Sequence, residues 1–394
     1  MQNTTYEDLC KIENKFGPAF YLFYPNKIKE NYYRIVDAFN RVYSPLSVAY
    51  AYKVNYMPYL CKIIKKIGGI AEVCSEIEFA VAKEIGVDGS HLIYNGPYLS
   101  KELAIDIIQL GGLINIDSFE ELCMVESIAK SINYKARIGV RCNIPVINRK
   151  PSKFGIPPGS DIFDAALQLL LSSEYLTFEC IHCHIKGRTI KEWMHRVLEM
   201  GKIAKYILCN YDLKISIIDL GGGLPIINDL NSKDYANAIG SALSSCFSDL
   251  QWHPHIIIEP GTAIATSSMQ YISKIVNIKS INSSGAAFLY GSSFQIKPLK
   301  RGYMVPISII SNSSGVYYDN LTFSGITCME DDVFYEGYSG KANINDFVLF
   351  EDVGAYSFVL KPPFITLNVP IVQYPEMIEI KRREYIDDVL DLYY

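Results

Sequence analysis

The chain has 394 residues, of which 49% are hydrophobic and 20% are charged, and its net charge at pH 7 is −5. This is the composition of an ordinary globular protein, and the mild acidity argues against a nucleic-acid or membrane-surface partner. The length predicts two domains, because a single hydrophobic core seldom grows this large.

The N-terminal residues MQNTTYEDLCKIENKFG are polar and lack the apolar core of a secretory signal. No later run approaches the roughly 18 uninterrupted apolar residues of a membrane-spanning helix. We therefore expect a cytoplasmic protein whose ten cysteines are reduced thiols.

A repeated pattern of strands and helices is predicted over residues 25–265. Amphipathic stretches with helical periodicity separate the apolar runs of this region. Such alternation indicates a buried parallel sheet, and eight units match a closed (β/α)₈ TIM barrel. An open doubly wound sheet would need a phosphate loop after its first strand, and none is present. The eight runs are rich in Val, Ile and Tyr and span 46–55, 70–75, 91–97, 113–118, 135–144, 178–187, 215–223 and 255–262.

The pattern changes after the barrel. Over 266–394, short runs with period-two alternation are separated by Gly, Ser, Asn and Pro, which predicts an all-β domain, either an antiparallel sandwich or a barrel. An earlier apolar run at 19–24, AFYLFY, is expected to join this second domain.

A C-x-x-C motif within the barrel region is spaced like a pair of zinc ligands. Cys180 and Cys183 form it, with histidines close by. Alternation along a strand places His182 and His184 on the face opposite Cys183, so the four side chains cannot share one metal ion. No metal site is expected.

The carboxyl ends of barrel strands are where active sites form, and several reactive residues fall there. Desolvation is expected to lower the pKa of Lys53 and make it a nucleophile able to form a Schiff base. The glycines at 221–223 and Gly261 let backbone N–H groups close around a phosphate. With Glu259 beside a pyridine nitrogen and His184 against its ring, the cofactor indicated is pyridoxal phosphate. A barrel aldolase would use the same lysine and glycines but gives Glu259 no role. Other polar residues at the expected strand ends are Ser75, Asn95, Asp117 and Arg141.

Eleven short blocks resemble those of one known family, in one order over nearly the whole chain. They are YAYKVN (50–55), EVCSEIE (72–78), NGP (95–97), DSFEEL (117–122), SKFGI (152–156), HCHI (182–185), DLGGG (219–223), EPG (259–261), IKP (296–298), GITCMEDD (325–332) and EDVGAYSF (351–358). In these blocks the chain resembles the fold-type III pyridoxal-phosphate decarboxylases. This group contains the diaminopimelate and ornithine decarboxylases and is related to alanine racemase.

The resemblance implies a role for each matching residue. Lys53 would form the Schiff base with pyridoxal 5'-phosphate, His184 would stack on the ring, and Glu259 would bind the pyridine nitrogen. The phosphate ligands would be Gly221, Gly222, Gly223, Gly261 and Tyr356. The resemblance also implies a homodimer with shared active sites, in which Cys328 of the partner subunit returns a proton after carbon dioxide leaves.

The chain departs from the family pattern mainly around the phosphate and the substrate. HIKG replaces the usual HIGS, and Thr262 replaces an arginine that helps to hold the phosphate. Lys186 and Arg188 are candidates to replace the lost ligands, or they are solvated charges on the barrel rim. Glu72 stands in place of an aspartate.

The residues implied to bind substrate also differ. Lys297 replaces an arginine that binds carboxylate, and Lys300 replaces a tyrosine three residues later. Met329 replaces the acid that pairs with a far ammonium group, unless a one-residue shift lets Glu330 take that place. These changes favour a substrate whose far end is neutral or anionic, such as a carboxylated amino-acid conjugate.

The leading functional prediction is therefore decarboxylation of an amino acid or an amino-acid-derived carboxylate. Alternatives are a diaminopimelate decarboxylase proper, an amino-acid racemase, and an inactive decarboxylase-like binding protein. Glu259 weighs against the racemase, because alanine racemases place an arginine near the pyridine nitrogen and so weaken the electron sink. The presence of Lys53, His184, Glu259 and Cys328 weighs against the inactive protein.

Overall fold

The computed structural model describes residues 4–146, 150, 152–226, 229–250, 252–281, 284–296, 305–360 and 363–393. The chain divides into two compact units. One consists of residues 28–264, and the other consists of residues 1–27 together with 265–394. None of the helices in the described ranges is long and apolar enough to cross a membrane.

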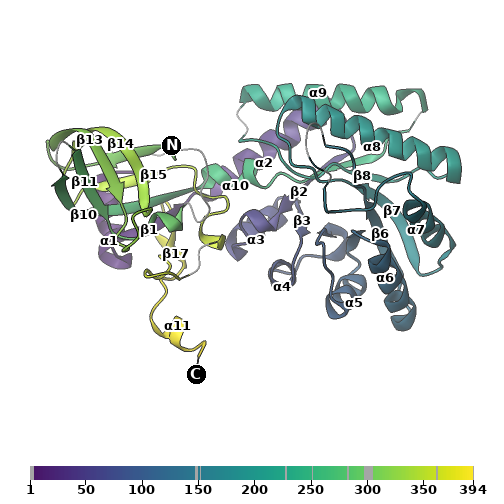
Figure 1. The fold of residues 1–394 in the computed structure, drawn as a ribbon, viewed down its shortest axis with the longest axis horizontal. Coiled ribbons are helices and arrows are strands. Elements are labelled where there is room, and N and C mark those ends of the chain that lie inside the picture. Colours follow the sequence, from purple (N-terminus) through teal and green to yellow (C-terminus); the bar gives the residue numbers. More distant parts are fainter. Residues whose placement is uncertain are drawn as a thin grey trace. The chain divides into compact units, whose positions relative to one another are not determined.

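The first unit contains a closed barrel of eight strands, β2 to β9 (Figure 1). Each strand pairs in parallel with the next, and β9 pairs with β2 to close the ring. This confirms the predicted TIM barrel. The strands are β2 (Leu46–Ala51), β3 (Ile70–Val73), β4 (Leu92–Tyr94), β5 (Leu113–Ile116), β6 (Ala136–Arg141), β7 (Leu176–His182), β8 (Ile217–Asp219) and β9 (His255–Ile258).

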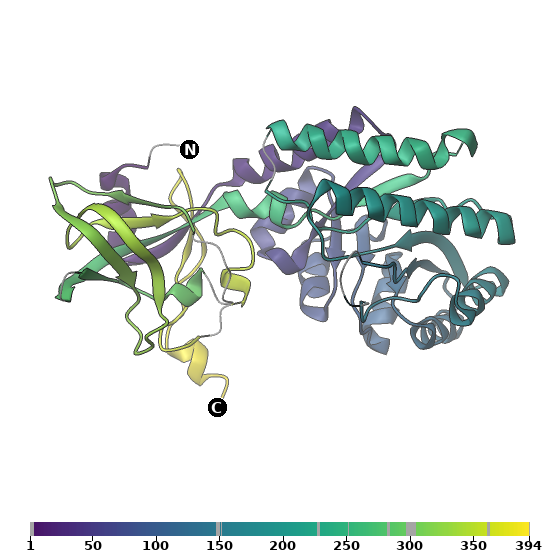
Figure 2. The same ribbon diagram turned by 45° about the horizontal axis from the view of Figure 1, so that its top comes forward.

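Helices between the strands cover the outside of the barrel (Figures 1 and 2). Several begin at a serine whose hydroxyl accepts a hydrogen bond from a first-turn amide, as Ser75 does for α4 and Ser118 for α6. The helices between the strands are α3 (Pro58–Lys66), α4 (Glu76–Glu84), α5 (Lys101–Leu110), α6 (Phe119–Ile132), α7 (Asp161–Ser172), α8 (Ile190–Tyr211) and α9 (Asp229–Phe247). In addition, α2 (Pro25–Asn40) precedes β2, and α10 (Thr262–Ala265) follows β9.

The barrel interior is a packed apolar layer. It includes Ala49, Ile93, Leu113, Cys180 and Ile257, which come from five strands and are buried. Cys180 therefore faces inward. Because side chains alternate along a strand, the inward set continues towards the mouth of the barrel with the two histidines that follow on and just after β7.

The second unit contains a nine-stranded sheet with the order β14-β13-β11-β10-β1-β16-β17, while β15 pairs with β10 and β12. The predicted all-β domain is confirmed, but it is not purely antiparallel, because β1 pairs with β16 and β11 with β13 in parallel. The strands are β1 (Ala19–Phe23), β10 (Met269–Ile281), β11 (Ser284–Leu289), β12 (Ile307–Ile310), β13 (Val316–Ser324), β14 (Val333–Ala342), β15 (Phe347–Phe350), β16 (Ile371–Gln373) and β17 (Ile378–Lys381).

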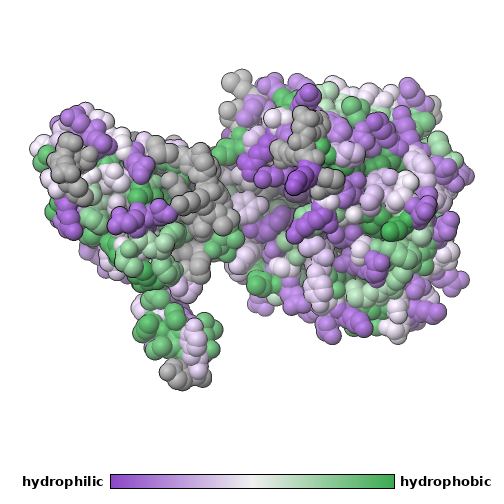
Figure 3. All heavy atoms as spheres, in the orientation of Figure 1, coloured by the Kyte–Doolittle hydropathy of each residue, from purple (hydrophilic) through white to green (hydrophobic). Residues whose placement is uncertain are grey.

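Two helices of the second unit, α1 (Tyr6–Phe16) and α11 (Asp387–Leu390), have no counterpart among the predicted elements. Leu9, Ile12 and Phe16 of α1 pack into the same core as Phe20 of β1. Around α11, by contrast, apolar side chains gather at the surface (Figure 3). The exposed ones are Tyr385, Ile386, Leu390, Leu392 and Tyr393.

Candidate active site

Lys53 stands just beyond β2, in a turn formed by Tyr52–Val54. Its Nζ lies 2.7 Å from Oε1 and 2.6 Å from Oε2 of Glu72 on β3. The Glu72 side chain is fully buried, whereas 30% of the Lys53 side chain is exposed. The lysine therefore reaches from the strand end towards solvent and is held by a buried acid.

The electrostatics of this pair correct one sequence-based expectation. Burial alone would lower the pKa of Lys53, but the carboxylates of Glu72 and Glu259 raise it above its ordinary value. Burial also raises the pKa of Glu72 to about 7, against the opposing pull of Lys53. The prediction of a lowered lysine pKa considered desolvation alone and is wrong for the site as it stands.

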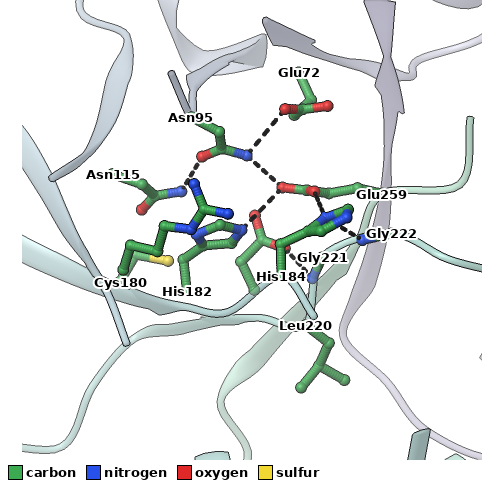
Figure 4. A network of polar contacts seen from close by, with 12 residues as sticks. Glu72, Asn95, Asn115, Cys180, His182, His184, Leu220, Gly221, Gly222 and Glu259 are labelled. Atoms are coloured by element: carbon green, nitrogen blue, oxygen red, sulfur yellow. Dashed lines mark hydrogen bonds and ion pairs between the residues drawn. The ribbon is translucent and has the colours of Figure 1, made fainter. Parts of the chain in front are cut away.

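Glu259 follows β9 and is the most central acid of the barrel mouth (Figure 4). Its Oε1 accepts a hydrogen bond from Asn95 Nδ2 and lies 3.6 Å from His182 Nε2. Its Oε2 lies 3.4 Å from His184 Nδ1. Burial alone would raise the pKa of Glu259, but His182 and the ammonium of Lys53 lower it, so the carboxylate is ionised.

His184 lies in the loop after β7, with 34% of its side chain exposed. Its Nδ1 accepts a hydrogen bond of 3.2 Å from the backbone N–H of Gly222. One atom cannot accept from Gly222 and also donate to Glu259, and the shorter contact favours a neutral ring with its proton on Nε2. Burial lowers the pKa of His184, which agrees with the neutral form.

A chain of amides links the acids at the barrel mouth. Asn95 Nδ2 also donates to Glu72 Oε1 over 3.3 Å, and Asn95 Oδ1 accepts a 2.6 Å hydrogen bond from Asn115 Nδ2. Asn95 was among the expected strand-end residues, whereas Asn115 was missed. The available signal was its position on β5, two residues before Asp117, which directly follows the strand.

Two further buried residues at the mouth were not predicted. Asp219 ends β8 and accepts a 2.9 Å hydrogen bond from Gly221 N–H, and burial raises its pKa well above the ordinary value. His182 is buried, and burial lowers its pKa to about 3. With Glu259 they are the one group of three potential metal-ligating side chains in the described ranges, and their ligand atoms lie within 4.8 Å of one another.

The loop after β8 requires glycine at successive positions. Gly221 and Gly223 have φ of +66° and +106°, which side chains disfavour. A Cβ on Gly222 would lie 2.6 Å from the carbonyl oxygen of Glu259, and one on Gly223 would lie 2.8 Å from that of Gly187. The loop is therefore a bare backbone surface beside His184, as expected for a phosphate cradle.

Arg196 of α8 lies behind this loop and was missed by the sequence analysis. The side chain is fully buried, and its guanidinium stacks 4.1 Å from the Trp193 ring. Its Nη1 donates to the carbonyl oxygens of Leu220 and Gly222, over 2.6 and 2.7 Å. Its Nη2 donates to the carbonyl oxygen of Ile185 over 2.9 Å. The only signal was an arginine within the apolar stripe of a helix.

The remaining predicted residues of the barrel unit are two charged residues after His184 and two residues after Glu259. The side chains of Lys186 and Arg188 are exposed. Gly261, which precedes α10, lies so close to Val54 that a side chain has no room there. Thr262 is the first residue of α10 and is partly buried.

The predicted residues of the second unit lie mainly in one turn between β13 and β14. Cys328 is exposed, as are Met329 and Glu330. Asp332 is buried and fixes the turn: its Oδ1 accepts from Ser293 N–H over 2.7 Å, and its Oδ2 accepts from the Thr327 hydroxyl over 2.7 Å. The third acid of this segment is thus a structural residue.

Tyr356 adopts a left-handed backbone with φ of +53°. Lys297, together with Lys300, lies outside the described residues. Lys53, His184, the glycine loop and Glu259 are therefore brought together within residues 28–264, whereas Cys328, Met329, Glu330 and Tyr356 belong to the other unit.

Comparison with known proteins shows which family the chain belongs to. Residues 26–266 match the family model described as "Pyridoxal-dependent decarboxylase, pyridoxal binding domain". The chain is 28% identical over 373 residues to diaminopimelate decarboxylase of Methanocaldococcus jannaschii, covering 89% of this chain and 84% of that protein.

Solved structures agree with this likeness. A crystal structure of diaminopimelate decarboxylase from M. jannaschii superposes with a TM-score of 0.89 and 25% identity, over 98% of this chain and 94% of that one. The structure of the same enzyme in complex with L-lysine gives a TM-score of 0.86 over the same shares.

The raised pKa of Lys53 predicts how its amine reacts. Only the neutral amine attacks an aldehyde, so the rate of trapping Lys53 with a small aldehyde and a reductant should rise about tenfold per pH unit from pH 7 to 9. Glu72→Gln removes the attracting carboxylate and should raise the rate at pH 7 at least ~10-fold. Peptide mass spectrometry gives the rate at Lys53, and Glu84→Gln, an exposed change on α4, is the control. A slower reaction in Glu72→Gln would contradict the electrostatic account.

Proposed function

The chain belongs to the family of pyridoxal-dependent decarboxylases, and from that premise we propose how its residues remove a carboxyl group as carbon dioxide. It is a carboxy-lyase, and its cofactor is pyridoxal 5'-phosphate. The proposal concerns the residues that hold the cofactor, the source of the returning proton, and the class of substrate.

The observation that supports the proposal most strongly is the convergence at the barrel mouth. A lysine amine, an ionised buried carboxylate, an imidazole and a bare glycine loop come from the ends of β2, β9, β7 and β8. These groups fit the aldehyde, the pyridine nitrogen, the ring face and the phosphate of one cofactor molecule. The bound cofactor supplies an electron sink for the bond that breaks at the substrate α-carbon.

Glu259 is proposed to bind the pyridine nitrogen. Its pKa is held low, so it remains an anion at neutral pH and favours the protonated, cationic ring. By holding that nitrogen protonated, Glu259 would strengthen the electron sink and favour loss of carbon dioxide over the milder chemistry of a racemase. Asn95 holds one oxygen of the carboxylate in place and leaves the other on the His184 side.

Lys53 is proposed to carry the cofactor, with Glu72 as its proton acceptor. The amine must be neutral to attack an aldehyde. Glu72 lies at hydrogen-bond distance of the amine, so its carboxylate is the nearest acceptor for the proton that Lys53 must lose.

Cys328 is proposed to return a proton to the α-carbon from the partner subunit of a homodimer. The thiol is exposed in a turn that Asp332 holds rigidly, which suits a side chain offered to another chain. The exposed apolar side chains around α11 are also a surface of the kind that pairs with a partner.

The substrate is proposed to carry a neutral or anionic group at its far end, as in a carboxylated amino-acid conjugate. Met329, next to Cys328, cannot accept a charge from an ammonium group, and burying an unpaired ammonium costs several kcal/mol. Diaminopimelate is the second candidate, because the similar enzymes carry that name and one was solved with L-lysine. Glu330 is the residue that would serve diaminopimelate if it took the place of the missing acid.

Shared active sites predict a specific recovery of activity. Lys53→Ala and Cys328→Ala homodimers should each be inactive. When they exchange subunits at random, half of the dimers are mixed and each mixed dimer has one intact site of two, so about a quarter of wild-type activity should return. Carbon dioxide release is measured after subunit exchange is confirmed with two affinity tags.

The matched control for this mixing experiment is Lys53→Ala with the double variant Lys53→Ala/Cys328→Ala. It has no intact site in any combination and should stay inactive. Confirmed exchange without recovery in the first mixture would exclude a site shared between subunits.

The substrate proposal is tested by steady-state kinetics on purified protein. Meso-diaminopimelate and ornithine should be turned over with kcat/KM below ~10⁴ M⁻¹s⁻¹, while some carboxylated amino-acid conjugate in a screen exceeds that value. Met329→Glu should raise kcat/KM for meso-diaminopimelate at least ~10-fold, which corresponds to 1.4 kcal/mol. Glu330→Gln, the control, should leave it unchanged.

The opposite results are equally informative. If the wild-type protein turns over meso-diaminopimelate above the same threshold and Glu330→Gln abolishes that activity, Glu330 is the acid and the substrate is the second candidate. The argument from Met329 then fails, while the decarboxylase assignment stands.

A further inference from the structure

The glycine loop after β8 lacks an obvious cation for a phosphate dianion. A phosphate held only by backbone amides forgoes charge-assisted hydrogen bonds, which are about twice as strong as neutral ones. Thr262 offers no charge, and the nearby Lys186 and Arg188 are exposed, where water and salt screen their charges. Among the described residues, the cationic side chain that contacts the glycine loop is Arg196. It binds the carbonyl side of the loop.

The contacts of Arg196 are made with the backbone rather than with an acid. Its two Nη atoms donate to three carbonyl oxygens, and its Nε has no hydrogen-bond partner among the described residues. None of the described carboxylates forms an ion pair with it. A buried positive charge is therefore left without a direct counterion, which is costly unless an anion binds nearby.

One of these carbonyls, that of Gly222, belongs to the peptide group that a phosphate on the loop would contact through the N–H of Gly223. In a trans peptide the N–H points opposite to the C=O. Arg196 holds the carbonyls of Leu220, Gly222 and Ile185, so the N–H groups of the following residues point away from the guanidinium. The N–H of Gly221 is bound to Asp219 and that of Gly222 to His184, whereas that of Gly223 is directed to the far side of the loop.

We propose that Arg196 is the cation that secures the cofactor phosphate in this chain, acting through the glycine loop instead of by direct contact. It is a positioning residue: it fixes the peptide groups with their N–H ends outward and adds a weakly screened positive charge beneath them. The proposal rests on the assignment of the phosphate to residues 221–223. A charge in a buried setting acts over a longer distance than one in water, so contact with the phosphate is not required.

The test distinguishes the contribution of the phosphate to binding from that of the rest of the cofactor. Cofactor-free protein is titrated with pyridoxal 5'-phosphate and with pyridoxal, which lacks the phosphate, and the visible absorbance of the bound compound is followed. Arg196→Gln should weaken binding of the phosphorylated compound at least ~10-fold, or 1.4 kcal/mol, and that of pyridoxal less than ~3-fold. The affinity ratio is the affinity for pyridoxal 5'-phosphate divided by the affinity for pyridoxal. Arg196→Lys keeps the charge and should recover most of the wild-type affinity ratio. Arg196→Met keeps the stem against Trp193 and replaces the glutamine variant if that one does not fold.

The controls are Lys186→Gln and Arg188→Gln, which remove one exposed charge each from the same region and should leave the ratio unchanged. An equal loss for both compounds in Arg196→Gln means a merely structural role and overturns the proposal. So does an unchanged ratio, or a fall in the ratio in either control as large as that in Arg196→Gln.

A second measurement leaves Arg196 in place. Thr262→Arg introduces a cation at the start of α10, and in the wild-type background it should change the affinity ratio less than ~3-fold, because the phosphate already has its charge partner. A gain of ~10-fold or more would show that the phosphate lacked a cation and would overturn the proposal. A wild-type protein that binds neither compound contradicts the cofactor assignment itself, which is a different failure.

Discussion

A buried negative charge, the carboxylate of Glu259, organises the mouth of the barrel. An ion removed from water must be compensated by its surroundings, and the compensation here comes from several strand ends at once. Asn95 donates a hydrogen bond, His182 lies against one oxygen, and the ammonium of Lys53 adds its field. These groups are polar and mostly buried, so each depends on the carboxylate as much as the carboxylate depends on them. The closed sheet brings them together because all its strands end at the same rim.

The charges of the site are separated into two poles. Glu259 makes the ring end negative, and Arg196 makes the loop end positive. Between them, Lys53 and Glu72 form an ion pair, while burial lowers the pKa of both histidines. Pyridoxal 5'-phosphate has the complementary distribution, with a basic ring nitrogen at one side and a phosphate dianion at the other. This distribution of charge supports the proposal that the barrel orients the cofactor before any substrate binds.

The sequence predicted the barrel and its main residues because each signal was local. An apolar run followed by Lys53, or by Gly221 and its neighbours, identifies a strand and its end from a few consecutive residues. What it missed depends on distant contacts. The Glu72 carboxylate reverses the pKa shift expected for Lys53, and nothing in its own block indicates that pairing. Arg196 is twelve positions after His184 and on a helix, where an arginine normally reads as a surface charge. The parallel pairing of β1 with β16 joins strands from the two ends of the chain, which no periodic pattern shows.

The central claim is that ionised Glu259 keeps the cofactor ring nitrogen protonated and so directs the enzyme to decarboxylation. The most direct measurement is NMR of the protein loaded with cofactor that carries an isotopic label at the ring nitrogen. We predict the chemical shift of a protonated pyridine in the wild-type protein at neutral pH, and that of an unprotonated pyridine in Glu259→Gln. An unprotonated ring nitrogen in the wild-type protein would contradict the account.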